Sequence, residues 1–318
     1  MGSRIETHSR RLRIVRCAGG GVPKRRIAVV EGLIALGHSG RSACRIAGVH
    51  RSTFLRQRRQ PLSTRTIRRI VVADEISRIH VQSRGTYGKR RIKAALLAEC
   101  EMIVNHKLVA SIMAERGLFG LPRRKRRGHP MLAVSTPADL VNRAFTAARP
   151  NELWCTDITE HPARDGKVYC CAVLDCFSKK IVGRSFSTIA DTLLVNNAVN
   201  MAMTERVTNE GLIVHADHGT QFTSWSFGEN LRRHRILPSF GTVGDCFDNA
   251  AMESFWGRMQ TELLNTRKWS TTLELTIAMS DWIDNFYNTE RRHSYLGHLS
   301  PTEYETLWLD IRPSPQLS

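Results

Sequence analysis

The sequence predicts an α/β fold, a mixed five-stranded sheet with flanking helices, preceded by small all-α modules. Charge divides the 318 residues into two halves: residues 1–150 contain 32 Lys and Arg against 8 Asp and Glu, whereas residues 151–318 contain 15 against 21. The hydrophobic pattern changes at the same place, from helical spacing before Pro150 to strand-like runs after it. We therefore expect a basic helical part that binds a polyanion and an acidic α/β part with another task.

The first part of the basic half predicts a flexible arm, residues 1–26, and a helix-turn-helix module, residues 27–60. Helical patterns at 27–36, 41–47 and 50–56 are separated by glycine-containing turns. The last two patterns, 41–47 and 50–56, outline the helix-turn-helix itself, and the second helix of such a motif enters the major groove of DNA. The candidates for DNA contact are Arg51, Ser52, Thr53 and Arg56. A helical hairpin with a solvated basic face is the alternative.

Residues 61–121 predict a second helical DNA-binding module. A helix begins near Tyr87 with apolar residues on one face and basic residues opposite, and Asn105 caps the next helix, which stops at Gly117. The candidates for DNA contact here are Lys89, Arg90 and Arg91. Residues 122–147 predict a basic linker. It begins with a basic cluster that includes the phosphate-binding candidates Arg123, Arg124 and Lys125, whose contacts carry no sequence specificity.

The acidic half predicts a catalytic domain at 148–268 and a C-terminal helical extension at 269–318. Its pattern is a three-strand meander, a crossing helix, a parallel strand, a helix, a short strand and a helix that carries an acid. The expected strands are 153–159, 168–177, 180–186, 212–215 and 236–240, and the expected helices are 192–205, 224–234 and 250–264. This order describes the ribonuclease-H-like architecture. Thr271 and Glu274 form a capping box that opens the extension.

Three acidic residues are the main functional candidates. Asp157 closes one strand-like run, Asp217 follows another, and Glu253 lies at the start of a helical pattern, away from its apolar stripe. In this architecture the three carboxylates meet at one end of the sheet. Because clustered carboxylates repel one another and hard oxygen ligands suit Mg²⁺ or Mn²⁺, the pattern predicts a divalent metal site. A capping or surface role is the alternative for each acid alone.

Several neighbouring residues have open roles. Asp248 is expected to cap the helix beside the site, and Asn249 to orient the loop that leads to Glu253. His215 and His218 flank Asp217, where each could reach a phosphate or a metal-bound water or could simply pack at the strand end. The alternative candidates for a metal-binding acid are Asp175, Asp245 and Asp248. Lys179, Lys180 and Arg184 are either contacts for target DNA or a solvated sheet edge.

Composition excludes other classes of protein. The eight cysteines include no C-x-x-C pair, which argues against a structural zinc site, and the adjacent Cys170 and Cys171 are expected to be buried free thiols. A basic patch for acidic lipids is the alternative to nucleic acid binding, but no apolar stretch is long enough to span a membrane. Without a signal peptide, a cytoplasmic protein is expected.

Four sequence strings occur in one order along the chain: WCTDIT at 154–159, HADHGTQF at 215–222, GDCFDNAAMESFW at 244–256 and YNTERRHSYLG at 287–297. Together, with 35 residues between Asp217 and Glu253, they resemble the DDE transposases of the insertion sequence 3 family, relatives of retroviral integrases. The resemblance extends from about residue 40 to 306. Gln260 stands where many members carry a Lys that contacts the transposon end.

The resemblance implies a mechanism and partners. Two Mg²⁺ or Mn²⁺ ions would be bridged by Asp157 and completed by Asp217 and Glu253. Water would free a 3′-hydroxyl at the end of the element, and this hydroxyl would attack a second phosphodiester. The implied partners are DNA, at the terminal inverted repeats and at the target, and further copies of the chain when two ends are synapsed. A hydrolysis-only nuclease on the same fold, or a domain adopted by the host, is the alternative.

Overall fold

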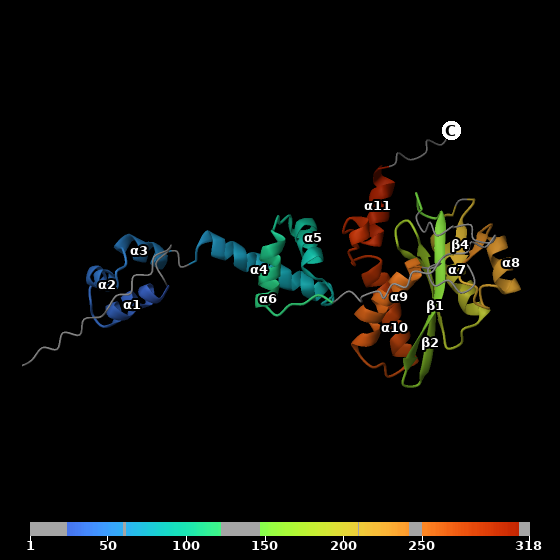
Figure 1. The fold of residues 1–318 in the computed structure, drawn as a ribbon, viewed down its shortest axis with the longest axis horizontal. Helices are drawn as coiled ribbons and strands as arrows, with labels where there is room; N and C mark the ends of the chain where they lie inside the picture. The colour runs from blue at the N-terminus through green and yellow to red at the C-terminus, as the bar shows by residue number, and fades with distance from the viewer. Residues whose placement is uncertain (1–23, 60–61, 122–146, 209, 242–249, 312–318) are drawn as a thin grey trace, which may run out of the picture. The chain divides into compact units, whose positions relative to one another are not determined.

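The computed structural model describes residues 24–59, 62–121, 147–208, 210–241 and 250–311 (Figure 1). It divides into two compact units, Met1–Val72 and Ala73–Ser318. Most of the predicted arm and of the basic linker lies outside the described residues. So do the candidates Arg123, Arg124, Lys125, Asp248 and Asn249.

The first unit contains three short helices where the sequence predicts them. They are α1 (Lys24–Ala35), α2 (Gly40–Ile46) and α3 (Arg51–Arg59). The Oγ atom of Ser39 caps α2 by accepting a hydrogen bond from the Ser42 amide at 3.2 Å. Gly48, with a φ of +63°, turns the chain between α2 and α3. Val30, Ala43 and Phe54 form part of the small core that holds the three helices together.

Three helices form the second helical module, as the sequence predicts. They are α4 (Thr64–Gln82), which begins in the first unit, α5 (Lys89–Cys100) and α6 (His106–Glu115). The cap predicted at Asn105 is confirmed, because its Oδ1 accepts a hydrogen bond from the Lys107 amide at 2.9 Å. Buried residues such as Ile76, Ile92 and Ile112 line the inner faces of the three helices.

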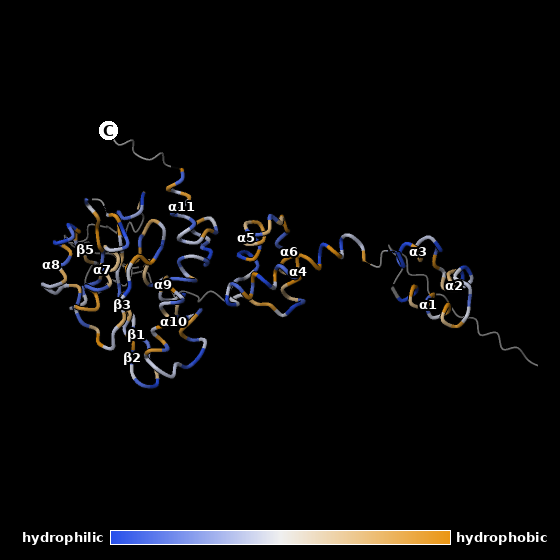
Figure 2. The backbone as a smooth tube through the Cα atoms, turned by 180° about the vertical axis from the view of Figure 1, so that it is seen from behind, coloured by the Kyte–Doolittle hydropathy of each residue, from blue (hydrophilic) through white to orange (hydrophobic). Residues whose placement is uncertain are grey.

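The remainder of the second unit is built on a five-stranded sheet in the order β3-β2-β1-β4-β5. The strands are β1 (Leu153–Ala163), β2 (Gly166–Asp175), β3 (Ile181–Ser187), β4 (Ile213–Ala216) and β5 (Leu237–Phe240). The first three pair antiparallel, whereas β4 and β5 run parallel to β1. This mixed sheet is the one that the sequence predicts. The tip of the β1–β2 hairpin is hydrophilic (Figure 2).

Helices cover both faces of the sheet (Figure 1). The helices on one face are α7 (Thr192–Glu205) and α8 (Trp225–Arg233), and those on the other are α9 (Ala250–Glu262), α10 (Thr272–Asp281) and the π-helix η2 (Trp282–Tyr287). Side chains on β2 alternate between the two cores, so Cys170 faces α9 and α10 while Cys171 faces α7. Both thiols are buried and free, as predicted.

The chain after η2 contains two more helical elements. They are the short 3-10 helix η3 (Ser294–Leu296) and the helix α11 (Pro301–Ile311), and a further 3-10 turn, η1 (Leu264–Thr266), follows α9. One half of the predicted capping box is present, because Thr271 Oγ1 accepts from the Glu274 amide at 3.0 Å. The Glu274 carboxylate accepts from the amide of Ser270, one residue before the cap, rather than from that of Thr271. No helix in the described part of the chain is long and apolar enough to cross a membrane.

The sheet differs from the prediction at β1. The strand expected at 153–159 is longer in the structure, because β1 pairs with β2 from Trp154 to Ala163, and Asp157 therefore lies in its middle rather than near its end. On its other side β1 pairs with β4 only from Leu153 to Cys155. Cys155 is paired with His215 in this parallel register, so Asp157 and Asp217 follow two residues later on their respective chains. The register therefore brings both acids to one end of the sheet.

Candidate active site

Asp157 is the most enclosed of the three candidate acids. Both of its carboxylate oxygens accept hydrogen bonds: Oδ1 from the Ile158 amide at 2.8 Å and Oδ2 from the indole Nε1 of Trp256 at 3.0 Å. Each oxygen keeps a second lone pair, because a carboxylate has about four acceptor positions. The side chain is thus fixed in orientation and still able to bind a further group.

The electrostatic surroundings of Asp157 indicate that the three acids converge. Burial first, and then the negative charges of Asp217 and Glu253, raise the pKa of Asp157 from 3.8 to about 6, against the two hydrogen bonds that stabilise the ionised form. Asp217 and Glu253 come from separate elements, so their joint effect on this one carboxyl group requires that both lie near it. A cation bound among the three would relieve this repulsion.

Asp217 lies in the turn that follows β4. Its side chain is exposed, and its Oδ1 accepts a hydrogen bond from the Gly219 amide at 2.9 Å. A Cβ atom at Gly219 would lie 3.0 Å from the same oxygen, so the turn closes tightly around the carboxylate. The turn therefore holds Asp217 at the end of the sheet without burying it.

The two histidines beside Asp217 have different surroundings. His215 is buried, and its Nδ1 lies 3.0 Å from the Oγ atom of Ser239 on β5, which corresponds to the packing alternative. His218 is exposed, with its ring centroid 5.6 Å from that of Phe240. Of the two, His218 is therefore the one that solvent or a ligand can reach.

Glu253 lies in the first turn of α9 and is exposed, as its position away from the apolar stripe predicts. Met252, Phe255 and Met259 fill the core beneath the helix. Trp256 follows Glu253 by three residues and lies on the same side of the helix, where its indole reaches Asp157. The sequence pattern gave Trp256 no role, and its spacing from Glu253 was the only available signal.

The chemistry of the three side chains fits a hard divalent cation, because all the donors are carboxylate oxygens and they repel one another. In the described part of the chain, no three His, Cys, Asp or Glu side chains are grouped closely enough to form a metal site.

Three charged residues that the sequence offered as further candidates for metal or DNA binding make contacts within the protein instead. Asp175 is buried and accepts hydrogen bonds from the amides of Asn151 and Phe177, so it stabilises the ends of β1 and β2. Lys180 pairs with Glu305 at 3.6 Å, and Arg184 pairs with Asp284 and Ser280. These contacts tie β3 and its preceding turn to the C-terminal helices.

The DNA-binding candidates lie on two separate helices. On α3, Arg51, Ser52 and Arg56 are exposed and Thr53 is partly buried. On α5, Lys89 and Arg90 are exposed, whereas Arg91 is half-buried with its guanidinium 5.6 Å from the centre of the Tyr87 ring.

The surroundings of Arg91 and Gln260 limit their roles. Burial and, to a lesser extent, the nearby Arg291 lower the pKa of Arg91 to about 10. Arg91 therefore faces the core of its own unit. The Nε2 atom of Gln260 on α9 donates to the Oδ1 of Asn265 at 2.6 Å, so an internal contact occupies this donor.

Family models match most of the described helices and strands. Two models described as "Integrase core domain" match residues 147–246 and 234–301, so the first includes Asp157 and Asp217 and the second includes Glu253. A model described as "HTH-like domain" matches residues 67–126, which corresponds to the second helical module rather than the first.

Solved structures similar to the chain include viral integrases. The simian T-cell lymphotropic virus intasome, in complex with a PP2A regulatory subunit, is 14% identical with a TM-score of 0.43 over 71% of this chain and 72% of its own. The HTLV-2 integrase catalytic core domain, solved in complex with magnesium, is 19% identical with a TM-score of 0.35 over 46% of this chain and 92% of its own.

Curated relatives share more of the sequence. The transposase for insertion sequence element IS904 of Lactococcus lactis is 33% identical over 246 residues, which is 76% of this chain and 96% of that protein. The putative transposase for IS986/IS6110 of Mycobacterium tuberculosis (strain H37Rv) is 34% identical over 266 residues, 81% of this chain and 94% of its own length. With such coverage at this identity, the chain belongs to the insertion sequence 3 family of transposases, which have an integrase core and an HTH-like domain.

Proposed function

We propose that this transposase cuts DNA at the ends of an insertion element and joins the freed 3′-hydroxyl to a second DNA strand. Asp157, Asp217 and Glu253 are its catalytic acids. One observation carries the assignment: the indole of Trp256, three residues after Glu253 on α9, donates a hydrogen bond of 3.0 Å to Asp157 on the central strand, so the helix that carries Glu253 lies against that strand. Two relatives are named as transposases for insertion sequence elements, which supports DNA of such an element as the substrate.

Asp157, Asp217 and Glu253 would together hold two Mg²⁺ or Mn²⁺ ions. Such ions supply Lewis acidity to the scissile phosphate and favour the ionised form of the attacking oxygen. The protein's own contribution is orientation. Trp256 and the Ile158 amide fix the two oxygens of Asp157, and the Gly219 amide fixes Asp217.

Both chemical steps exchange one phosphorus–oxygen bond for another. In the first, a water oxygen bonds to phosphorus, the bond to the 3′ oxygen breaks, and the products are a 3′-hydroxyl and a 5′-phosphate. In the second, this 3′-hydroxyl bonds to a phosphorus atom of the target strand, whose own 3′ oxygen leaves with a proton. The number of phosphodiester bonds is conserved in the second step, so joining needs no external energy source.

We assign the binding of DNA to the basic helices α3 and α5. The exposed Arg51, Ser52 and Arg56 on α3 and Lys89 and Arg90 on α5 are the contacts proposed for the terminal repeats. The HTH-like match at 67–126 supports the role of the second module. Synapsis of two ends requires at least two copies of the chain, so a homo-oligomer is the proposed active form.

A cleavage and joining assay tests the proposal. The full chain is incubated with Mg²⁺ and a labelled duplex that carries the terminal repeat of its own element, next to a duplex of scrambled sequence. Asp157→Asn, Asp217→Asn and Glu253→Gln are each expected to abolish cleavage while the affinity for the repeat stays within about twofold, because the fold is kept and only transition-state stabilisation is lost.

Each result decides one part of the proposal. A variant that retains wild-type cleavage removes that acid from the site. Cleavage by the wild type without joined products would identify the hydrolysis-only nuclease instead. The control is Asp310→Asn, which removes an exposed carboxylate at the end of α11 and is expected to cut and join like the wild type.

A further inference from the structure

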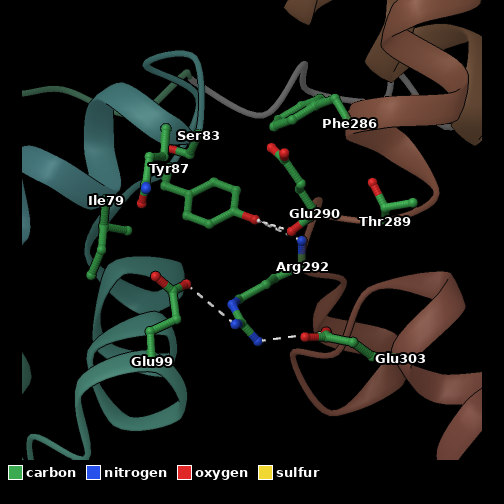
Figure 3. Close-up of a pocket in the computed structure, with 10 residues that line it drawn as sticks. Ile79, Ser83, Tyr87, Glu99, Phe286, Thr289, Glu290, Arg292 and Glu303 are labelled. Carbon is green, nitrogen blue, oxygen red and sulfur yellow. Dashed lines mark hydrogen bonds and ion pairs between the residues drawn. The ribbon is translucent and has the colours of Figure 1, made fainter.

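A short segment after η2, residues 288–293, contacts both the second helical module and α9, the helix that carries Glu253 and is called the catalytic helix below. On the side of the module, the Tyr87 hydroxyl donates to the carbonyl oxygen of Glu290 at 3.0 Å and accepts from the amide of Arg292 at 2.7 Å (Figure 3). These residues are more than two hundred positions apart in the sequence. Tyr87 is buried, so water does not compete for these bonds.

Arg291, which lies between Glu290 and Arg292, is bound to α9. The guanidinium of Arg291 forms a two-pronged ion pair with Glu262, with Nε donating to Oε2 at 2.7 Å. The side chains are 2% and 7% exposed, so solvent screens the pair little. Glu262 is the last residue of α9, the helix that carries Glu253 in its first turn. Displacing Arg291 would therefore displace the end of the catalytic helix.

The same segment is also attached to the sheet. The side chain of Asn288 bonds to the backbone of Ile181 on β3 in both directions, each at 2.9 Å. Because these bonds imitate those of a neighbouring strand, the start of the segment cannot move independently of the sheet. Only its other contacts, at 290–292, join it to the helical module.

Ion pairs also join the module to the core. Arg292 lies between Glu99 of α5 at 3.3 Å and Glu303 of α11 at 3.7 Å (Figure 3). Arg84 pairs with Asp281 at 2.8 Å. A cavity of about 440 Å³ remains beside them, lined among others by Ile79, Tyr87 and Phe286. A boundary with such a cavity is not close-packed like a core. Its geometry therefore depends on the individual hydrogen bonds and ion pairs.

We propose that Tyr87, Arg291 and Arg292 form a positioning link that sets the catalytic helix relative to the DNA held by the second helical module. All three residues are buried, so they act through α9 and Glu253 rather than by contact with the substrate. The inference rests on the proposed function, since it assumes that the module binds DNA and that Glu253 is catalytic. It predicts that weakening the link separates end binding from end cleavage.

The variant Tyr87→Phe tests the link with a change of one oxygen atom. The matched control is Tyr295→Phe, which lies near the same segment but has an exposed side chain. For each full-length protein three quantities are measured: the Kd for the terminal repeat, the single-turnover cleavage rate at saturating repeat DNA, and the nicking rate on scrambled DNA with Mn²⁺. For Tyr87→Phe we expect an unchanged Kd, unchanged nicking of scrambled DNA and about a tenfold slower cleavage of the repeat.

Hydrogen exchange supplies a readout that does not depend on activity. The Arg292 amide loses its acceptor in Tyr87→Phe, so its exchange is expected to accelerate, and exchange in the last turn of α9 is expected to accelerate with it. Faster exchange at Arg292 without any change in α9 would overturn the link, even if the wild type failed to cut DNA. If the wild type does not cut, the proposed function fails, while the exchange result still decides the inference.

A charge exchange guards against simple misfolding. Asp281→Arg places two cations together at an exposed site and is expected to slow repeat cleavage in the same selective way, whereas the double variant Arg84→Glu with Asp281→Arg is expected to restore it. Three results would each contradict the proposal. They are an equal loss of cleavage rate on repeat and scrambled DNA, a weaker affinity for the repeat, and a cleavage defect in Tyr295→Phe as large as in Tyr87→Phe.

Discussion

The indole Nε1 of Trp256 donates a hydrogen bond of 3.0 Å to Oδ2 of Asp157 and thereby connects the helix that carries Glu253 to the central strand of the sheet. An indole is a donor only, so this contact favours the ionised form of the acid. It also leaves Oδ2 with one lone pair for a cation. Trp256 thus orients a proposed metal ligand in the way that outer hydrogen-bond partners orient ligands in other metal sites.

Replacing Trp256 with Phe is expected to raise the concentration of Mg²⁺ needed for half-maximal cleavage by about tenfold, since loss of an orienting partner typically costs 10–100-fold in metal affinity or activity. The maximal rate should recover in part at high Mg²⁺. Titration of cleavage against Mg²⁺ measures the change. The control is Trp308→Phe, on α11, which should leave the titration unchanged. Equal Mg²⁺ requirements in both variants would remove Trp256 from the site.

The raised pKa of Asp157 predicts how stability changes with pH in the absence of metal. The folded-state pKa, about 6, exceeds the ordinary value of 3.8, so the folded protein binds this proton more tightly and loses stability as pH rises from about 4 to 6. Two pKa units correspond to nearly 3 kcal/mol, and Asn offers Trp256 a poorer acceptor. Asp157→Asn is therefore expected to stabilise the metal-free protein by about 1–2 kcal/mol at pH 8.

Urea unfolding at pH 8 and at pH 4 measures this effect. At pH 4 the wild-type carboxyl group is already protonated, so the gain should vanish there. Added Mg²⁺ should stabilise the wild type more than the variant. A gain of equal size at both pH values would show that ionisation of Asp157 is not its cause.

Gly183 on β3 allows α7 to approach the sheet closely. A Cβ atom there would lie 2.2 Å from the carbonyl oxygen of Ala198 and 2.8 Å from the Cβ of Ala202. Gly183→Ala is therefore expected to lower the free energy of unfolding by about 1–3 kcal/mol, the usual cost of overpacking. Gly228→Ala is the matched control, because its Cβ would meet nothing within 4 Å on α8. That change should stabilise the protein by about 0.5–1 kcal/mol.

The exposed arginines of α3 are expected to contribute to DNA affinity. Arg51→Ala and Arg56→Ala should each weaken binding of the terminal repeat, and a residue that contacts phosphate should reduce the slope of log K against log salt by about 1. A residue that reads a base should instead reduce the preference for the repeat over scrambled DNA. Arg235→Ala, which removes an exposed arginine paired with Glu210, serves as the control. Unchanged binding in both α3 variants would exclude α3 from the interface.

The sequence predicted most elements of the sheet domain because their patterns are local. Helix α7 has the predicted bounds, since Asp191 caps it and buried residues recur at helical spacing along it. The strand predicted at 153–159 was too short, because the last four residues of β1, Glu160–Ala163, lack a strand pattern of their own. That part is a strand only because β2 pairs with it residue by residue.

Contacts between distant residues could not be predicted from one sequence. The three acids are candidates because the sequence places each of them near the end or the start of a predicted element and together they match a family motif. The contacts of Trp256 with Asp157 and of Tyr87 with Arg292 join residues 99 and 205 positions apart, and no local pattern encodes them. Arg91 looked like a surface cation because its neighbours Lys89 and Arg90 are basic. Only the packing of α5 shows that it turns inward.

The central claim is that Asp157, Asp217 and Glu253 bind divalent cations together. Anomalous diffraction at the manganese edge, from crystals of the full chain bound to its terminal repeat and grown with Mn²⁺, tests it most directly. The account predicts manganese peaks bounded by the oxygens of all three side chains, and their loss in Asp157→Asn crystals. Manganese bound elsewhere, or an ordered active site in which the three carboxylates share no metal, would contradict it.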